Sequence, residues 1–121
     1  MSLQGAQRRR YARQLLLSEV GEAGQETLLA ARFRPNAGCD REAYAVASDY
    51  LERAGLAPEP TGAEVRVTDA DAIERLAGSP SLREAAVWIA GSFAAVEHLK
   101  EVLGIAAARD LPSDLCLCPD S

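Results

Sequence analysis

The longest apolar stretch of the chain, residues 85–96, constrains the fold more than any other feature. It spans twelve residues and is too short for a membrane, because a helix needs about 20 apolar residues to cross a bilayer. Its first half is apolar all round, so we expect a buried central helix with Trp88 and Phe93 in the core. Small residues recur every four positions on this helix, at Ala86, Ala90 and Ala94. They would let another backbone approach closely.

Weaker patterns predict the elements around this central helix. Apolar residues at helical spacing predict further helices over residues 7–18, 26–32, 41–54 and 70–77. Alternation and β-branched residues predict a strand over residues 64–68. A short strand at residues 33–35 would be ended by its proline. The central helix itself should end near Gly104.

Acidic residues and glycines mark the ends of these helices. Asp40 and Asp69 are expected to cap the helices that follow them, and Gly55 and Gly78 to end those helices. The central helix has two candidate starts, Ser79-Pro80 or the capping box Ser81-x-x-Glu84.

Length and composition fit one helix-rich domain. The chain has 121 residues, of which 48% are hydrophobic, 26% charged and only 5% aromatic, and its commonest residues favour helix. We expect a helix-dominated α/β fold with about two short strands and four to five helices. Residues 1–105 should form a single domain. Residues 106–121 contain two prolines and no periodicity, so they are expected to be a loosely ordered tail.

The charge distribution argues against nucleic acid as a partner. The net charge is −5, yet residues 1–34 carry six arginines against three acids, so the remainder is strongly acidic. The run Arg8-Arg9-Arg10 is not continued by a basic stripe or by aromatics that could stack on bases. An acidic body also repels phosphate at long range. These arginines are therefore expected to contact an acidic partner or one anionic ligand.

The cysteines and the lone histidine give no catalytic or metal site. The first residues lack the apolar core of a signal peptide, and three cysteines, an odd number, indicate reduced thiols in the cytoplasm. Cys116 and Cys118, even with the remote Cys39, fall short of the four ligands of a structural zinc site. An inert tail is the favoured interpretation, with zinc or redox chemistry as the alternative. His98 is expected at the solvent edge of its helix.

Three blocks of the sequence resemble one enzyme family. The first is Arg10-Tyr11-x-Arg13-Gln14 followed by Gly21-x-x-Gly24-Gln25-x-x-Leu28. The second is Arg53-Ala54-Gly55 with the Asp-x-Asp ending of residues 65–74, and the third is Gly-Ser-x-x-Ala-x-Glu-x-x-Lys within residues 89–100. In residues and order these blocks resemble the ThiF/MoeB/HesA adenylyltransferases, which activate the C-terminus of a ubiquitin-like sulfur carrier by adenylation. The chain looks like a shortened, degenerate member.

The phosphate loop of that family is not conserved in this chain. The family's first strand feeds a Gly-x-Gly-x-x-Gly loop, whose bare backbone lets a helix N-terminus meet phosphates. Here the corresponding residues 35–40 keep only Gly38, and Asp40 puts a negative charge where a triphosphate would lie. At 4 Å such a repulsion costs about 4 kcal/mol when the effective dielectric constant is near 20.

The family's other catalytic parts also have no counterpart. After Asp71 the family continues into an Asn-x-x-Arg-Gln segment whose arginine contacts phosphate, whereas this chain has Arg75 to Pro80. The segments that would carry a catalytic lysine, a magnesium-binding aspartate and a loop cysteine are missing. Lys100 is the only lysine and lies in the late helix, so it cannot replace the lost one. We therefore expect no adenylation, no catalytic residues, no metal and no cofactor.

The resemblance implies a reduced Rossmann-like core, a homodimer and three candidate ligand-binding residues. Arg13 matches the arginine that reaches across the family dimer to the ATP of the neighbouring subunit; the alternative is a surface arginine. Gly38 is the remnant of the phosphate loop. Asp69 matches the ribose-binding acid, although the helix-capping role is favoured.

Three classes of function stay open at this point. The leading one is a non-catalytic, dimeric binding or scaffolding protein. The second is an inactive partner subunit that docks on a full-length ThiF/MoeB-like protein and supplies Arg13 in trans. A ubiquitin-like sulfur carrier is a further candidate partner. The third is a vestigial binder of a nucleotide or small ligand at Gly38 and Asp69. Fold-level analogy alone does not choose between them.

Overall fold

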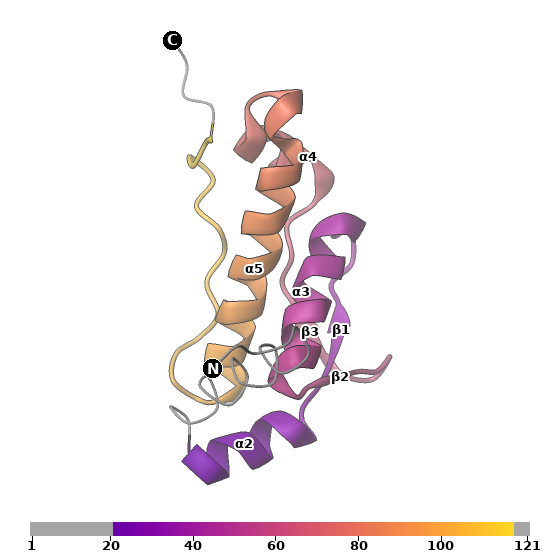
Figure 1. Cartoon of the computed structure of the whole chain (residues 1–121), viewed down its shortest axis with the longest axis vertical. Coiled ribbons are helices and arrows are strands. Elements are labelled where there is room, and N and C mark those ends of the chain that lie inside the picture. Colours follow the sequence, from indigo (N-terminus) through magenta and orange to yellow (C-terminus); the bar gives the residue numbers. More distant parts are fainter. Residues whose placement is uncertain (1–20, 118–121) are drawn as a thin grey trace, which may run out of the picture.

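The computed structural model describes residues 21–117 and arranges them as a helix-dominated α/β fold with a small parallel sheet (Figure 1). Its elements in chain order are α2 (Gly21–Ala30), β1 (Arg32–Pro35), α3 (Arg41–Ala54), β2 (Ala57–Pro58), β3 (Ala63–Val65), α4 (Ala70–Ala77), the 3-10 turn η1 (Pro80–Leu82) and α5 (Arg83–Val102). The helix expected over residues 7–18 lies outside the described residues. The helix expected at residues 26–32 begins earlier, at Gly21, and includes Gly24.

The sheet has the order β2-β1-β3, and both outer strands run parallel to β1. Strands are expected from the sequence only over residues 33–35 and 64–68, which correspond to β1 and β3. No strand is expected at β2, because the prolines around residue 58 predict a loop. Pro58 fits on this edge because its neighbours make the bonds: Ala57 N donates to Ala31 O at 3.3 Å, and Glu59 N donates to Phe33 O at 2.9 Å. An edge strand tolerates a proline whose missing N–H is not needed.

The strand expected over residues 64–68 is shorter than its sequence pattern suggests. β3 ends at Val65, and the chain beyond it bonds to the loop after β1. Val67 N donates to Oδ1 of Asn36 at 3.0 Å and not to a strand carbonyl, and Asp40 N donates to Thr68 O at 2.8 Å. Side-chain and loop bonds therefore replace the sheet ladder over these residues.

The predicted helix caps are confirmed. Asp40 Oδ2 accepts from Ala43 N at 2.9 Å, and Asp69 Oδ1 accepts from Ala72 N at 2.8 Å. The helices that these residues begin end at glycines with left-handed backbone, Gly55 at φ 115° and Gly78 at φ 72°. Such a conformation suits glycine because it has no Cβ.

The start of the long helix is the Ser79-Pro80 alternative. Ser79 Oγ accepts from Ser81 N at 3.3 Å, and Pro80 opens η1. The helix α5 then begins at Arg83 without a side-chain cap, so the capping box from Ser81 does not form.

The long helix α5 packs mainly on α3 and α4, as its central position in Figure 1 shows. The three alanines of the small-residue ridge are buried, as expected. The closest approach lies beside this ridge, at Gly91. A Cβ built there would lie 2.5 Å from Ala43 O and 2.6 Å from the Cβ of Val46. The small residues of α5 thus bring the two helix backbones together.

The prediction that Trp88 is a core residue is wrong. Its side chain is 56% exposed, and Ile89 and Val96 on the same side of α5 are 38% and 40% exposed. Phe93 is half-buried. The reason is that α3, α4 and the sheet cover only part of the circumference of α5. The apolar sequence shows that every side of the helix is hydrophobic, but not which sides the rest of the fold covers.

The prediction that His98 lies at a solvent edge is also wrong, because only 4% of the residue is exposed. The chain after α5, for which a loosely ordered tail is expected, makes definite contacts through Leu117. It runs back along α5 (Figure 1), and Leu117 N donates to Leu76 O at 2.7 Å. Leu111 and Leu117 pack against the core.

No helix in the range 21–117 combines the length and the apolar character that crossing a membrane requires.

Candidate functional site

The candidate site is a cleft of about 330 Å³ beyond the carboxyl ends of β1 and β3. The loop after β1 forms one wall and the start of α4 forms the other. Gly38 and Asp69, two of the three ligand-binding residues expected from the sequence, both line it. The third, Arg13, lies outside the described residues. Clefts at this edge of a parallel sheet are common ligand sites because two loops diverge there.

The N-terminus of α3, where the resemblance would place phosphates, is occupied by the chain's own carboxylate. Asp40 caps the helix through Oδ2, and its Oδ1 lies 3.2 Å from Nη2 of Arg83 at the start of α5. Nη1 of Arg83 also bonds to Glu42 at 2.7 Å. Asp40 is only 7% exposed, so its charge is held in place from two sides. The carboxylate of Asp40 is therefore the negative group that interacts favourably with the dipole at the N-terminus of α3.

Gly38 owes its place to backbone conformation. Its φ is 79°, a left-handed value, and a Cβ built on it would meet nothing within 4 Å. The residue therefore allows a tight turn into α3 without any close contact that requires a bare backbone. In a phosphate loop, glycines serve close approach as well, and that second requirement is not visible here.

Asp69 takes the capping role that was favoured for it, because it caps α4, and it also lines the cleft. Asp69 is exposed to solvent. One carboxylate oxygen accepts from Ala72 N, which is the ordinary use of an aspartate at this helix position. Lining the cleft makes Asp69 available to a ligand hydroxyl, and the cap explains the residue without any ligand.

Three cleft residues were missed by the sequence reading. Asn36 joins the two walls, since its Nδ2 donates to Val67 O and its Oδ1 accepts from Val67 N, both at 3.0 Å. Thr68 has a buried Oγ1 without a hydrogen-bond partner in the described part of the chain. Arg75 is exposed at the rim. No motif in the sequence marks Arg75, so only the position of α4 places it here.

Cys39 follows Gly38 directly in the loop beside the cleft, and it is not set up as a nucleophile. Burial, reinforced by the adjacent carboxylate of Asp40, raises the pKa of the Cys39 thiol. A thiol must ionise to attack or to bind a metal. Cys39 is therefore protonated at neutral pH and chemically quiet.

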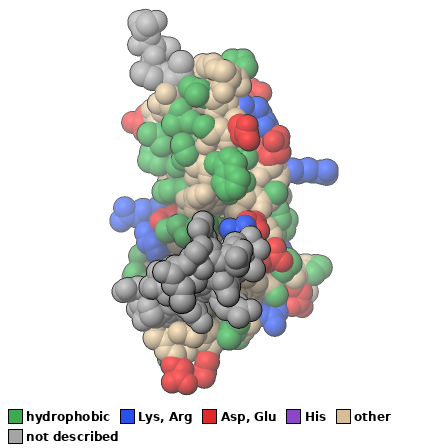
Figure 2. Space-filling view, viewed as in Figure 1, with side chains coloured by type: hydrophobic (Ala, Val, Ile, Leu, Met, Phe, Trp, Pro, Cys, Tyr) green, Lys and Arg blue, Asp and Glu red, His purple; other side chains and the backbone are tan. Residues whose placement is uncertain are grey.

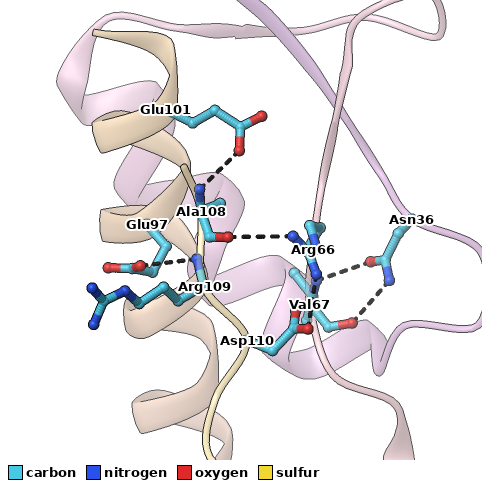
Figure 3. A network of polar contacts seen from close by, with 8 residues as sticks. All are labelled: Asn36, Arg66, Val67, Glu97, Glu101, Ala108, Arg109 and Asp110. Atoms are coloured by element: carbon cyan, nitrogen blue, oxygen red, sulfur yellow. Dashed lines mark hydrogen bonds and ion pairs between the residues drawn. The ribbon is translucent and has the colours of Figure 1, made fainter. Parts of the chain in front are cut away.

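A second polar cluster lies behind the cleft, where α5 meets the chain after it (Figure 3). Glu97 is 6% exposed, bonds to Lys100 at 2.7 Å and accepts from Arg109 N at 3.0 Å. The bond from Lys100 is the main cause that lowers the pKa of Glu97. His98 lies beside it with a buried Nε2 that has no partner among residues 21–117. Burial lowers the pKa of His98.

Comparisons with protein-family models, with curated proteins and with solved structures found no match to this chain. Within residues 21–117, no group of three or more His, Cys, Asp or Glu side chains is placed to hold a metal ion. The site is therefore defined by its own geometry: a shallow cleft lined by the carboxylate of Asp69, the guanidinium of Arg75 and Thr68 with its buried hydroxyl.

Proposed function

We propose that this protein is a non-catalytic binding or scaffolding module, active as a homodimer and related to the ThiF/MoeB adenylyltransferases through a reduced Rossmann-like core. The observation that carries the proposal is Asp40, which fills the N-terminus of α3 with a carboxylate. In the enzymes that this chain resembles, a helix in this position would face the triphosphate of ATP.

Several contacts support the loss of adenylation. A phosphate approaching α3 would meet a fixed negative charge, and moving Asp40 away would break both its cap bond and its contact with Arg83. At 4 Å the repulsion alone is about 4 kcal/mol at an effective dielectric constant of 20. Phosphoryl chemistry needs the opposite arrangement, with cations and backbone N–H groups around the phosphates.

The outward side of α5 supports the homodimer. Trp88, Ile89 and Val96 are exposed along one side of the helix, at the spacing that places residues on a common face. No charged side chain interrupts residues 85–96. Figure 2 shows hydrophobic side chains gathered over the upper part of the face that α5 and the following chain present. Exposed apolar patches of this kind mark interaction surfaces.

A second copy of the chain is the occupant that this stripe fits. Ser92 is the midpoint of the stripe, with Trp88 four residues before it and Val96 four residues after it. An antiparallel copy related by a two-fold axis near Ser92 would bring the large indole of each protomer beside the smaller Val96 of the other. Two-fold interfaces need such self-complementarity.

Sedimentation equilibrium at micromolar concentration tests the dimer. We expect twice the 12.9 kDa of the chain for the wild type and a monomer for Trp88→Glu, because the charge would be buried in the interface. The exposed Arg53, on α3, provides the control substitution Arg53→Glu, which should leave the dimer intact. A wild-type protein that sediments at 12.9 kDa would contradict the proposal.

ATP–pyrophosphate exchange tests the loss of catalysis. We expect no exchange above background, with or without a sulfur-carrier protein. Exchange that copurifies with the wild type and is abolished by Asp69→Asn would show that the cleft still works as an adenylation site.

The cleft favours one second candidate, a binder of a small anionic or hydroxylated ligand. The side chain of Arg75, which makes no hydrogen bond or ion pair with another described residue, could receive an anion, while Thr68 and Asp69 could bond to hydroxyls. Thermal unfolding with millimolar AMP, ATP or ribose 5-phosphate tests it. A rise in melting temperature that Arg75→Gln removes would favour this candidate, and no shift with any of them would set it aside.

The partner-subunit alternative rests on the resemblance of Arg13 alone. If Arg13 acts in trans, Arg13→Ala should lower adenylation by a full-length homologue on the order of a thousandfold. Equal rates with the two proteins would eliminate this alternative.

A further inference from the structure

The chain after α5 is held against the body by polar contacts from both sides (Figure 3). We call residues 106–117 the strap. Two carboxylates of α5 accept its backbone N–H groups: Glu101 Oε2 from Ala108 N and Glu97 Oε1 from Arg109 N, both at 3.0 Å. These acceptors lie about one helical turn apart, so they hold two successive residues of the strap.

The other side of the strap is held by the chain that follows β3. Arg66 donates from Nη1 to Ala108 O at 3.3 Å, and its Nη2 lies 2.8 Å from Asp110 Oδ2. These groups are half-exposed or more, and exposed pairs of this kind contribute little by themselves. The carboxylates of α5, of which Glu97 is buried, are the stronger part of the hold.

His98 lies directly beneath the strap. It lines a cavity of about 10 Å³ together with Ala108 and Arg109 of the strap, so these residues form one wall over the imidazole. The volume is that of about one water molecule. With 4% of the residue exposed and Nε2 unpartnered within the described range, the imidazole is buried without the hydrogen bonds that would stabilise a charge.

We propose that neutral His98 keeps the strap closed, and that a proton on His98 releases the strap and opens the neighbouring cavity. That cavity, of about 210 Å³, lies against Val67 and Phe93 and has Asp110 and Leu111 of the strap in its wall. The device would couple acidification to exposure of this cavity, whose lining mixes polar and apolar side chains. It is independent of the proposed function.

The charges around His98 explain how a proton would act. In the described part of the chain, the carboxylates that line its cavity are Glu64, Glu97 and Glu101, and the cations are Arg66 and Arg109; Lys100 already bonds to Glu97. A protonated imidazole would repel the two arginines. It would also compete for Glu97 and Glu101, which are the acceptors that hold the strap.

Burial favours the neutral form before release. It lowers the pKa of His98, while Glu101 acts in the opposite direction. In the released state the imidazole faces water and regains its ordinary pKa of about 6.5. The open state therefore binds the proton more tightly than the closed one, and acidification below that pH must favour opening.

Two NMR measurements on the intact protein test the proposal. His98 is the only histidine, so one imidazole C–H resonance reports its titration, and hydrogen exchange reports the protection of the Ala108 and Arg109 amides. Between pH 7.5 and pH 5.5 we expect protection at these two amides, corrected for the intrinsic exchange rate, to fall by about tenfold. At each pH the α3 amides that exchange through global unfolding should stay better protected than these two, because the strap opens without unfolding the body, and His98→Gln should remove the effect.

The proposal is overturned if the two amides keep their protection while His98 titrates. It is equally overturned if their protection is lost only below pH 4.5, in the range where the carboxylates titrate. This second comparison needs the wild type alone, so it remains decisive if His98→Gln does not fold.

Discussion

Arg83 at the first residue of α5 reaches across to Asp40 at the N-cap of α3, with 3.2 Å between Nη2 and Oδ1. The contact joins residues 43 positions apart and fixes the start of one helix to the start of the other. It also holds the carboxylate at the end of α3 in place. One aspartate thus caps a helix and ties two helices together.

We expect Asp40→Ala to lower the free energy of unfolding by about 2 kcal/mol, because an N-cap bond is lost and Arg83 loses its buried partner. Asp40→Asn is the matched control. An asparagine caps as well as an aspartate, so this variant should lose only the ion pair, at most about 1 kcal/mol. Urea unfolding measures both. Equal effects would show that the charge, and not the cap, is the stabilising part.

Gly91 is predicted to be essential for the packing of α5 on α3. A Cβ at this position would lie 2.5 Å from Ala43 O, and a backbone oxygen cannot rotate away. Gly91→Ala should therefore destabilise the protein by about 2 kcal/mol, even though alanine favours helix by about 1 kcal/mol over glycine. Ser92→Ala, at the neighbouring half-buried position, should change stability by less than about 0.5 kcal/mol. A stabilised Gly91→Ala variant would show that the helices lie further apart.

Replacing Trp88 should affect association much more than folding. Because more than half of the side chain is exposed, we expect Trp88→Ala to change the stability of the monomer by about 1 kcal/mol or less. Leu51→Ala, at a fully buried site, should cost about 2–5 kcal/mol. Denaturation at protein concentrations below the dissociation constant of the dimer separates the effect on folding from the effect on association. A large loss for Trp88→Ala under those conditions would place the indole in the monomer core.

Local signals allowed much of the fold to be predicted. Asp40, Gly55, Asp69 and Gly78 mark helix ends because capping depends on neighbours within four residues. The strand at Pro58 was missed for the opposite reason. Whether a proline is tolerated there depends on which N–H groups the adjacent strand needs, and that adjacent strand lies more than twenty residues away in the sequence.

The candidate site was predictable only where a motif marked it. Gly38 and Asp69 were identified through the resemblance, and the structure places both at one cleft. Thr68 and Arg75 carry no motif, so only the position of their elements brings them there. The burial of His98 could not be foreseen, because it depends on Ala108 and Arg109 folding back over α5.

Global stability should fall on mild acidification because of His98. Burial holds its pKa below the ordinary value in the folded state, so the unfolded chain binds a proton at a higher pH than the native one. The contribution of neutral His98 to stability is complete above about pH 7. It is lost progressively as the pH falls below about 6.5 toward the folded pKa. Urea unfolding at pH 7.5 and pH 5.5 measures the loss.

Glu97 provides the internal comparison for this pH dependence. Its pKa is also lowered in the folded state, mainly by the bond from Lys100, but for a carboxylate the stabilisation is present above the unfolded pKa and is lost only below about pH 4.5. The two groups therefore act in separate pH windows. His98→Gln should flatten the stability profile between pH 7.5 and pH 5.5 and leave the decline below pH 4.5, whereas Glu97→Gln should do the reverse. If His98→Gln keeps the upper decline, another group titrates there and the burial of His98 does not control stability.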